Sequence, residues 1–231
     1  MTEDLDFDTA LVTAALALAG EIGWSRVSVA EAARRAALPL DRARGRFAST
    51  QAILLRFGRM ADQAALVGAD SNPDASHRDR LFDILMRRLD VLQLHREGTL
   101  ALMRAVPLDP GLGLMLAMSS VQSMGWMLEG AGVDATGLRG LLRSKGLLAV
   151  WLWTVRTWKD DDSEDMSATM SALDKALERA ERAEGMMGRR GTTSVPDEEM
   201  EPTAHEPPAA VVESLPHNPP PTPDLPAAPP A

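Results

Sequence analysis

Arginine is the residue type whose spacing in this sequence most suggests a chemical role. Between Arg34 and Arg59 there are seven arginines and one acidic residue, Asp41, although the whole chain has a formal net charge of −9. A guanidinium group presents N–H donors that match phosphate oxygens and the O6 and N7 atoms of guanine. A local cluster of this kind is typical of a surface that contacts DNA, because phosphate attraction depends on the local patch.

Three of these arginines are expected on one short helix. Arg42 and Arg46 are four residues apart and share a helix face, whereas Arg44 points elsewhere, toward a flanking phosphate or solvent. Basic helix faces that contact only solvent are common. We favour contact with DNA because these arginines follow a capped helix and a tight turn.

Two short helices joined by that turn are predicted to position the arginines. Ser28 to Glu31 is a capping box that opens the first helix, which is expected to stop near Pro39. Pro39 suits the first turn of the second helix, which closes on Phe47, and Ser49 is expected to cap a longer third helix. This arrangement is a helix-turn-helix, whose second helix enters the major groove of DNA. The residues expected at the DNA are Ser28, Arg42, Arg44, Gly45, Arg46, Ser49 and Thr50.

The rest of residues 1–190 is predicted to be helical, because no segment keeps the alternating pattern of a strand. The predicted fold class is therefore all-α. We expect a DNA-binding domain over residues 8–68 and a helical domain for effector binding and dimerisation over residues 76–188. Within them, the first helix is expected to start near Asp8, and Gly98 is expected to separate two helices.

The C-terminal segment has a different composition. Twelve of the sixteen prolines follow Gly191, and residues 191–231 contain seven acidic residues and no Lys or Arg. Such a segment cannot bury enough apolar surface to offset the entropy lost on ordering. Residues 191–231 are predicted to be a disordered, acidic, proline-rich tail.

Methionines are concentrated in the middle of the predicted C-terminal domain. Methionine adapts to irregular ligands, although such a cluster is more often ordinary core. Small residues among the methionines leave room for an apolar pocket that would bind a small molecule or a lipid. The residues expected to line this pocket are Met103, Met115, Met118, Ser119, Gln122 and Trp126.

A later helix carries three tryptophans and is apolar on several sides. Such a helix is usually covered by neighbours, which suggests a subunit interface in a homodimer. The residues expected at this interface are Trp151, Trp153, Met170 and Leu173.

The order of the N-terminal features resembles the tetracycline-repressor (TetR) family of bacterial regulators. The resemblance implies a DNA-binding helix-turn-helix and a C-terminal helical domain that binds a small molecule and dimerises, usually through its last two helices. Ala37 stands where this family usually has Gly, and Thr50 where a phosphate-contacting Lys is common. The segments that carry the resemblance are residues 10–19, Gly23-Trp24, residues 28–36, the helix ending in Phe47, and residues 49–54.

A second stretch, residues 158–174, resembles the C-terminal part of ubiquinone-biosynthesis accessory proteins. Those proteins keep a TetR-like fold but bind lipid and not DNA. The alternative function is therefore an accessory protein that binds lipid or a quinone precursor and has lost DNA binding. The two functions differ in whether Arg42, Arg44 and Arg46 project outward or are engaged by acidic residues.

The sequence contains no motif of a known enzyme class. It has no cysteine, its four histidines have no metal-ligand spacing, and no GxSxG, HExxH, P-loop or Rossmann motif is present. The longest apolar run, Leu147 to Trp153, is far shorter than the ~20 residues that span a bilayer. The N-terminus also lacks the pattern of a signal peptide.

We therefore expect a cytoplasmic regulator without catalytic residues, cofactor, metal or membrane span. Its expected partners are double-stranded operator DNA, an apolar small molecule or lipid, and a second copy of the chain.

Overall fold

The computed structural model describes residues 2–69 and 74–190 of the chain. All regular structure in these residues is helical, which confirms the predicted all-α class. Short 3-10 turns cover Trp24–Arg26 and Val106–Leu108. The α-helices are α1 (Thr2–Ile22), α2 (Val29–Arg35), α3 (Leu40–Arg46), α4 (Thr50–Leu66), α5 (His77–Leu94), α6 (Arg96–Ala105), α7 (Pro110–Gly130), α8 (Gly137–Lys159) and α9 (Ser167–Arg190).

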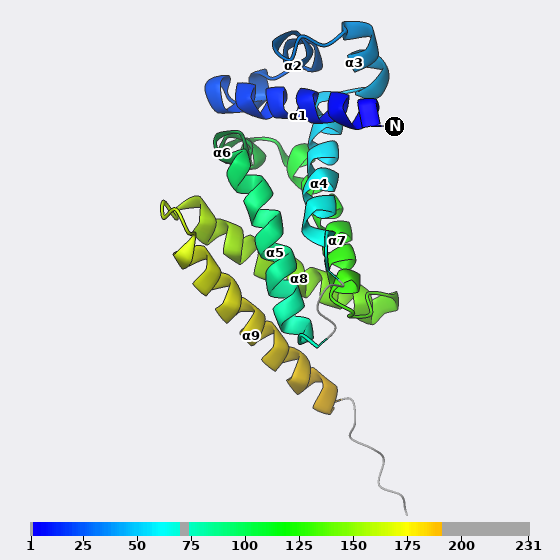
Figure 1. Ribbon diagram of the computed structural model, residues 1–231. Helices are drawn as coiled ribbons and strands as arrows, with labels where there is room; N and C mark the ends of the chain where they lie inside the picture. The colour runs from blue at the N-terminus through cyan, green and yellow to red at the C-terminus, as the bar shows by residue number, and fades with distance from the viewer. Residues whose placement is uncertain (1, 70–73, 191–231) are drawn as a thin grey trace, which may run out of the picture. The chain divides into compact units, whose positions relative to one another are not determined.

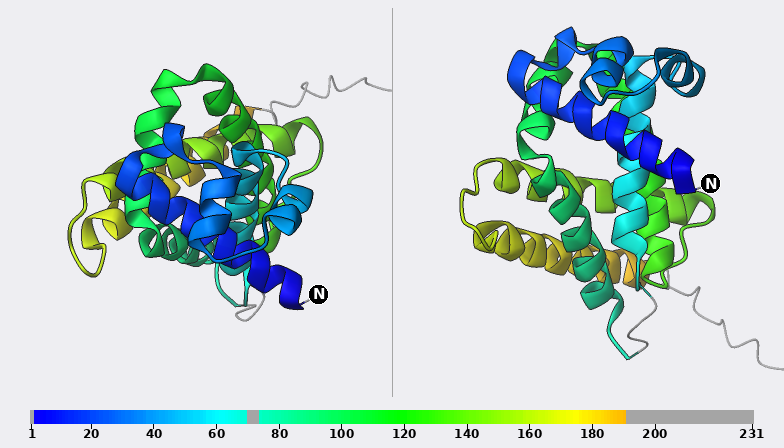
Figure 2. Two further views of the ribbon diagram at one scale, coloured as in Figure 1. Left: turned by 90° about the horizontal axis from the view of Figure 1, so that it is seen from above. Right: turned by 45° about the horizontal axis from the view of Figure 1, so that its top comes forward.

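The first three helices form a small unit beside the start of α4. α2 and α3 lie on the same side of α1, with α3 next to the N-terminal half of α1, and α4 leads away from this unit toward α5 and α7 (Figures 1 and 2). The predicted start of α2, the end of α3 and the start of α4 agree with the structure to within one residue. Two details differ: α2 ends at Arg35, before the predicted stop near Pro39, and Pro39 is the N-cap residue of α3 and precedes its first turn.

The start of α1 differs from the prediction. The helix begins at Thr2, about two turns before the predicted start at Asp8. Glu3 and Asp4 lie in its first turn, where negative charge is favoured by the exposed N–H groups of a helix N-terminus. Glu3 and Asp4, which precede the predicted start, therefore belong to the helix and contact Arg42 of α3.

The predicted helix break at Gly98 is also wrong. The break falls at His95, between α5 and α6, and Gly98 is buried inside α6. At this point α6 crosses α1 so closely that a Cβ atom on residue 98 would lie 2.3 Å from the carbonyl oxygen of Leu16. Glycine is needed here because two backbones touch.

One hydrophobic core connects the N-terminal unit with the remaining helices. It runs without interruption from α1 through α4, α5 and α7 to α8 and α9. α8 and α9 run side by side in both views, and α5 packs on α9 (Figures 1 and 2). The fully buried large side chains include Leu11, Leu16, Ile53, Ile84, Leu85, Leu89, Met124, Met127, Trp158 and Leu173.

The predicted tail, residues 191–231, lies outside the described residues.

The helices of the described part of the chain were compared with the length and composition that a membrane span requires, and none of them meets both requirements alone. One bent pair, Arg96–Leu108 and Pro110–Gly130 at 119°, passes a test of length and composition alone.

Candidate nucleic-acid interface and apolar groove

The turn between α2 and α3 is built from local hydrogen bonds. The Ser28 hydroxyl accepts a hydrogen bond from the Glu31 N–H at 3.1 Å and so caps α2. At the other end, the Leu38 N–H donates to the Ala33 carbonyl at 2.9 Å, and Ala37 adopts a φ of 53°. This is the Schellman arrangement, in which the residue after the helix is usually glycine. The helix-turn-helix therefore forms with alanine in a left-handed conformation.

Of the three arginines on α3, one projects outward. Arg44 is exposed, and its one described hydrogen bond is to the Ala48 carbonyl at 3.3 Å. Gly45 beside it is also exposed, and a Cβ atom there would meet no other atom within 4 Å. The outward face of α3 is therefore open around Arg44 and Gly45.

The other two arginines of α3 are held by acidic residues of α1. Arg42 donates to Glu3 and to Asp4, both at 2.8 Å, and its guanidinium carbon lies 4.6 Å from the centre of the Phe7 ring. These hydrogen bonds raise the pKa of Arg42. The hydrogen bond from Arg42, together with the charge of Arg46, lowers the pKa of Asp4. The contacts keep these groups ionised and paired.

Arg46 is held by a buried carboxylate. Its Nε and Nη2 donate to the two carboxylate oxygens of Asp8 at 2.5 and 2.8 Å, which is a bidentate pair. The hydrogen bond to Asp8 raises the pKa of Arg46. The Asp8 side chain is 7% exposed and also pairs with Arg56 on α4 at 3.0 Å. Asp8 therefore joins α1, α3 and α4.

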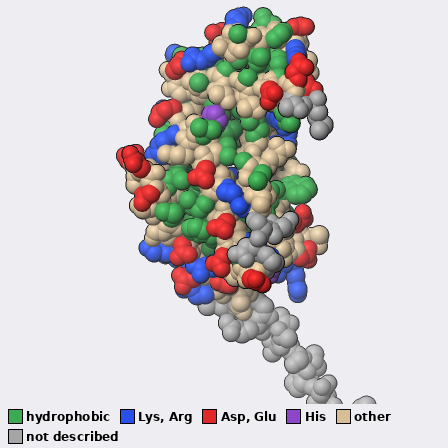
Figure 3. Space-filling model, viewed as in Figure 1, with side chains coloured by type: hydrophobic (Ala, Val, Ile, Leu, Met, Phe, Trp, Pro, Cys, Tyr) green, Lys and Arg blue, Asp and Glu red, His purple; other side chains and the backbone are tan. Residues whose placement is uncertain are grey.

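Two further members of the arginine cluster also have acidic partners. Arg34 pairs with Glu31 at 2.8 Å, and Arg35 pairs with Glu21 at 2.5 Å. Within the described residues, Arg44 and Arg59 are the members of the cluster without an ion pair. Red and blue side chains are correspondingly interspersed at the end formed by α1 to α3, without one large basic patch on the face seen in Figure 3.

Three of the predicted DNA contacts have a structural role in this chain. Besides Ser28, Ser49 caps α4 by accepting from the Ala52 N–H at 3.3 Å. The Thr50 hydroxyl donates to the Val27 carbonyl at 3.4 Å and ties the start of α4 to the segment before α2. Ser28 and Ser49 stay exposed, so their contact with DNA remains a prediction.

An open apolar groove lies between α4 and α7. It has a volume of about 480 Å³ and contains four of the six residues predicted to bind a ligand. The two others lie elsewhere, since Met103 packs against the core and Trp126 is 57% exposed one turn beyond the groove. The residues that line the groove are Leu55, Gly111, Leu114, Met115, Met118, Ser119 and Gln122.

The surface of α7 explains why this groove is apolar. Residues 110–128 contain no charged residue, although several of them face solvent. A surface helix of a globular protein normally carries charged residues on its outer face. The uncharged face of α7 therefore suits an apolar ligand better than bulk water.

The predicted dimer interface needs correction. Trp151 and Leu173 are buried in the core of the chain itself, and the ring of Trp151 lies 4.7 Å from the guanidinium carbon of Arg88. They have no surface to offer a second chain. Trp153 is 54% exposed and remains available. The other exposed apolar side chains of α8 are Leu138, Leu141, Leu142 and Leu152.

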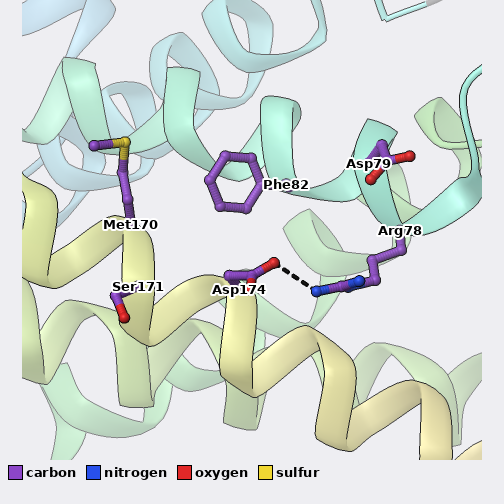
Figure 4. Close-up of a pocket in the computed structure, with 6 residues that line it drawn as sticks. All are labelled: Arg78, Asp79, Phe82, Met170, Ser171 and Asp174. Atoms are coloured by element: carbon purple, nitrogen blue, oxygen red, sulfur yellow. Dashed lines mark hydrogen bonds and ion pairs between the residues drawn. The ribbon is translucent and has the colours of Figure 1, made fainter.

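Met170 lines a second cavity, of about 410 Å³, between α5 and α9. Figure 4 shows Met170 at one end of this cavity and Arg78 at the other, with Phe82 between them and opposite Asp174, which pairs with Arg78 at 2.5 Å. The pair links α5 to α9, so this cavity is the space between two packed helices.

A buried polar contact at the centre of the helical domain was not predicted from the sequence. Arg88 pairs with Asp62 at 3.0 Å, and the Ser123 hydroxyl donates to the same carboxylate at 2.6 Å. Burial lowers the pKa of Arg88, and the charge of Asp62 opposes that shift. The contact joins α4, α5 and α7 around one charge pair. Among the described residues, no group of three His, Cys, Asp or Glu side chains could hold a metal ion.

Comparisons with known proteins give matches at the level of structure. No protein-family model matches the chain, and no curated protein is significantly similar to it in sequence. The chain superposes on a TetR transcriptional regulator from Nitrosomonas europaea ATCC 19718 with a TM-score of 0.62 and 24% identity, over 77% of this chain and 99% of that one. A TetR transcriptional regulator from Rhodococcus sp. RHA1 gives a TM-score of 0.51 and 18% identity, over 74% and 93%. The comparisons give no support for the resemblance of residues 158–174 to ubiquinone-biosynthesis proteins.

Proposed function

Because the chain has the TetR-family fold, we propose that it is a DNA-binding transcriptional regulator and not an enzyme. The observation that carries the proposal is the outward face of α3, the second helix of the helix-turn-helix. Arg44 projects from this face beside Gly45, where no side chain blocks the approach of a phosphate backbone or a base edge. Residues 8–68, extended to the start of α1, would form the DNA-binding domain, and the proposed location is the cytoplasm.

Arg44 is the residue to test first. A specific arginine contact with guanine is worth ~1–3 kcal/mol. Arg44→Ala should therefore weaken binding to the preferred fragment of the source genome by about five- to 150-fold. Arg59→Ala removes the same charge from an exposed position on α4 and is the matched control, with an expected change below about twofold. Equal losses in both variants would refute a specific role for Arg44.

We further propose that α7 of the C-terminal domain, residues 76–188, and Leu55 of α4 together bind an apolar molecule in the groove between α4 and α7. Leu55 lines this groove and belongs to the same helix that Ser49 caps next to α3. A ligand that moved α4 would therefore move the recognition helix. Such coupling is typically worth ~1–3 kcal/mol of binding free energy.

The groove can be tested by filling it. Ser119→Phe places a ring in the groove and should reduce the uptake of long-chain apolar probes, measured by native mass spectrometry and by displacement of a fluorescent fatty acid. Trp126→Phe, one turn outside the groove, is the control and should bind normally. Unchanged binding by Ser119→Phe would place the ligand elsewhere.

A homodimer through α8 completes the proposal. The exposed apolar residues Leu138, Leu142, Leu152 and Trp153 recur at helical spacing along one side of α8. An apolar stripe of this kind is normally covered by another surface. The proposed interface is therefore the outer side of α8 and does not include Trp151 on the inner side of α8 or Leu173 on α9.

A second function is favoured by one specific observation. Arg42 and Arg46 are already neutralised by Glu3, Asp4 and Asp8, which would suit a protein that binds an apolar molecule and no longer binds DNA. Both functions use the groove, so ligand binding cannot separate them. Salt-dependent binding of the wild-type protein to fragments of its own genome separates them directly. Binding supports the regulator, and its absence at low salt supports the second function.

A further inference from the structure

The first two turns of α1 present an acidic surface to the recognition helix. Asp4 and Asp8 are four residues apart and share a helix face, and Glu3 lies beside Asp4. Their carboxylates bind the guanidinium groups of Arg42 and Arg46 with the geometry that a DNA phosphate would use. The acidic turn thus occupies two of the three arginines that α3 could offer to DNA.

The two arginines differ in how firmly they are held. Asp8 is buried, accepts a bidentate pair from Arg46 and also pairs with Arg56, so removing Arg46 would leave a buried charge with fewer partners. Glu3 and Asp4 are 84% and 49% exposed, and ion pairs between exposed groups contribute little to stability. Arg46 is therefore fixed in the fold, whereas Arg42 can exchange one anionic partner for another.

Phosphate is a suitable replacement partner for Arg42. The guanidinium group of Arg42 lies over the Phe7 ring, so it is already ordered near the surface of α3. DNA binding by a cation also releases condensed counterions, a gain that a surface carboxylate does not provide. The acidic turn would weaken such binding both by occupying Arg42 and by repelling the approaching backbone.

We propose that Glu3 and Asp4 compete with nucleic-acid phosphate for Arg42, so that the N-terminal turn of α1 sets the DNA affinity of its own recognition helix. This inference rests on the proposed regulatory function. It assigns separate roles to the three arginines of α3: Arg44 contacts DNA directly, Arg42 does so after release from the acidic turn, and Arg46 holds α3 on α1.

The test compares two acidic residues of the same helical turn. Asp4→Asn frees Arg42 from one of its two carboxylate partners and also removes the pair between Asp4 and Arg46 at 3.1 Å. Asp6→Asn removes the same charge from an exposed residue without an ion pair in the described part of the chain. DNA affinity is measured at two salt concentrations, and circular dichroism checks the fold. Asp4→Asn should bind about three- to tenfold more tightly than wild type, Asp6→Asn should change affinity by less than about twofold, and adding Arg42→Ala to Asp4→Asn should abolish the gain.

Three outcomes overturn the inference. The first is an equal gain from Asp4→Asn and Asp6→Asn, which would show an effect of total charge. The second is a gain that persists after Arg42→Ala, and the third is no gain at all while wild type binds DNA, which leaves the proposed function intact.

If no variant binds DNA, the proposed function fails. The competition of Glu3 and Asp4 for Arg42 is then tested by retention on a heparin column. Later elution of Asp4→Asn alone supports competition for Arg42, and elution at the same salt concentration as wild type overturns it.

Discussion

Replacing Gly98 by alanine tests the closest contact between α1 and α6. The added Cβ atom would lie 2.3 Å from the Leu16 carbonyl oxygen and 2.8 Å from its carbonyl carbon. A carbon and a carbonyl oxygen normally approach to about 3.3 Å, so the two helices must separate by about 1 Å. Both contact atoms belong to the backbone and cannot rotate away. Overpacking of this kind costs ~1–3 kcal/mol, and the better helix propensity of alanine returns ~1 kcal/mol. Because both contact atoms are backbone, the cost falls at the upper end of this range, ~3 kcal/mol, and we expect Gly98→Ala to destabilise the protein by about 2 kcal/mol net.

Urea unfolding followed by circular dichroism measures this change, and Gly45→Ala is the matched control. Gly45 also lies inside a helix, but a Cβ atom there meets nothing within 4 Å. Gly45→Ala should therefore stabilise the protein by ~1 kcal/mol through helix propensity alone. The two identical exchanges should shift the midpoint in opposite directions. A Gly98→Ala protein as stable as wild type would show that α1 and α6 are not in backbone contact, and the reasoning would be wrong.

Three further predictions each concern one residue. Ala37→Gly should raise the unfolding free energy by ~0.5–1 kcal/mol, because a φ of 53° is strained for alanine and natural for glycine; an unchanged urea midpoint would count against the Schellman turn. Trp153→Glu should give monomers in sedimentation velocity at micromolar concentration while Trp126→Glu on α7 remains dimeric, and a dimeric Trp153→Glu protein would exclude the outer side of α8 as the interface. Burial opposes ionisation of Asp161, but hydrogen bonds from Ser163 and Thr169 prevail and lower its pKa, so its stabilisation is present above about pH 4 and is lost as the pH falls through the lowered pKa. Asp161→Asn should thus cost ~1–2 kcal/mol at pH 7 and progressively less below pH ~4, whereas a constant difference across this range would contradict the prediction.

The helix-turn-helix could be predicted because its signals are local. The Ser28 and Ser49 caps each bind an N–H three residues ahead, and the turn closes through bonds within five residues. Such contacts depend on residue types at fixed spacing and on little else. The same reasoning failed at Gly98, whose partner, Leu16, lies on another helix.

The candidate ligand and dimer residues show the same contrast between local sequence signals and the packing of one helix on another. The concentration of methionines and small residues indicated an apolar pocket that includes Met115, Met118 and Gln122, and the structure brings these residues to a groove with Leu55 of α4. Periodicity could not tell which side of α8 the core would cover. Trp151 turned out to be buried and Trp153 exposed, because two residues apart on a helix they point in different directions.

The sequence by itself determined the all-α class, the capped helices and the concentration of arginines on α3. Those properties follow from backbone hydrogen bonds and side-chain spacing over a few residues. Only the tertiary structure decided the electrostatic state of the arginines. Arg42 and Arg46 meet carboxylates 38 or 39 residues earlier in the chain, and that meeting depends on how α1 packs against α3. A charge acts through its distance to other charges in space, and the sequence alone does not give that distance.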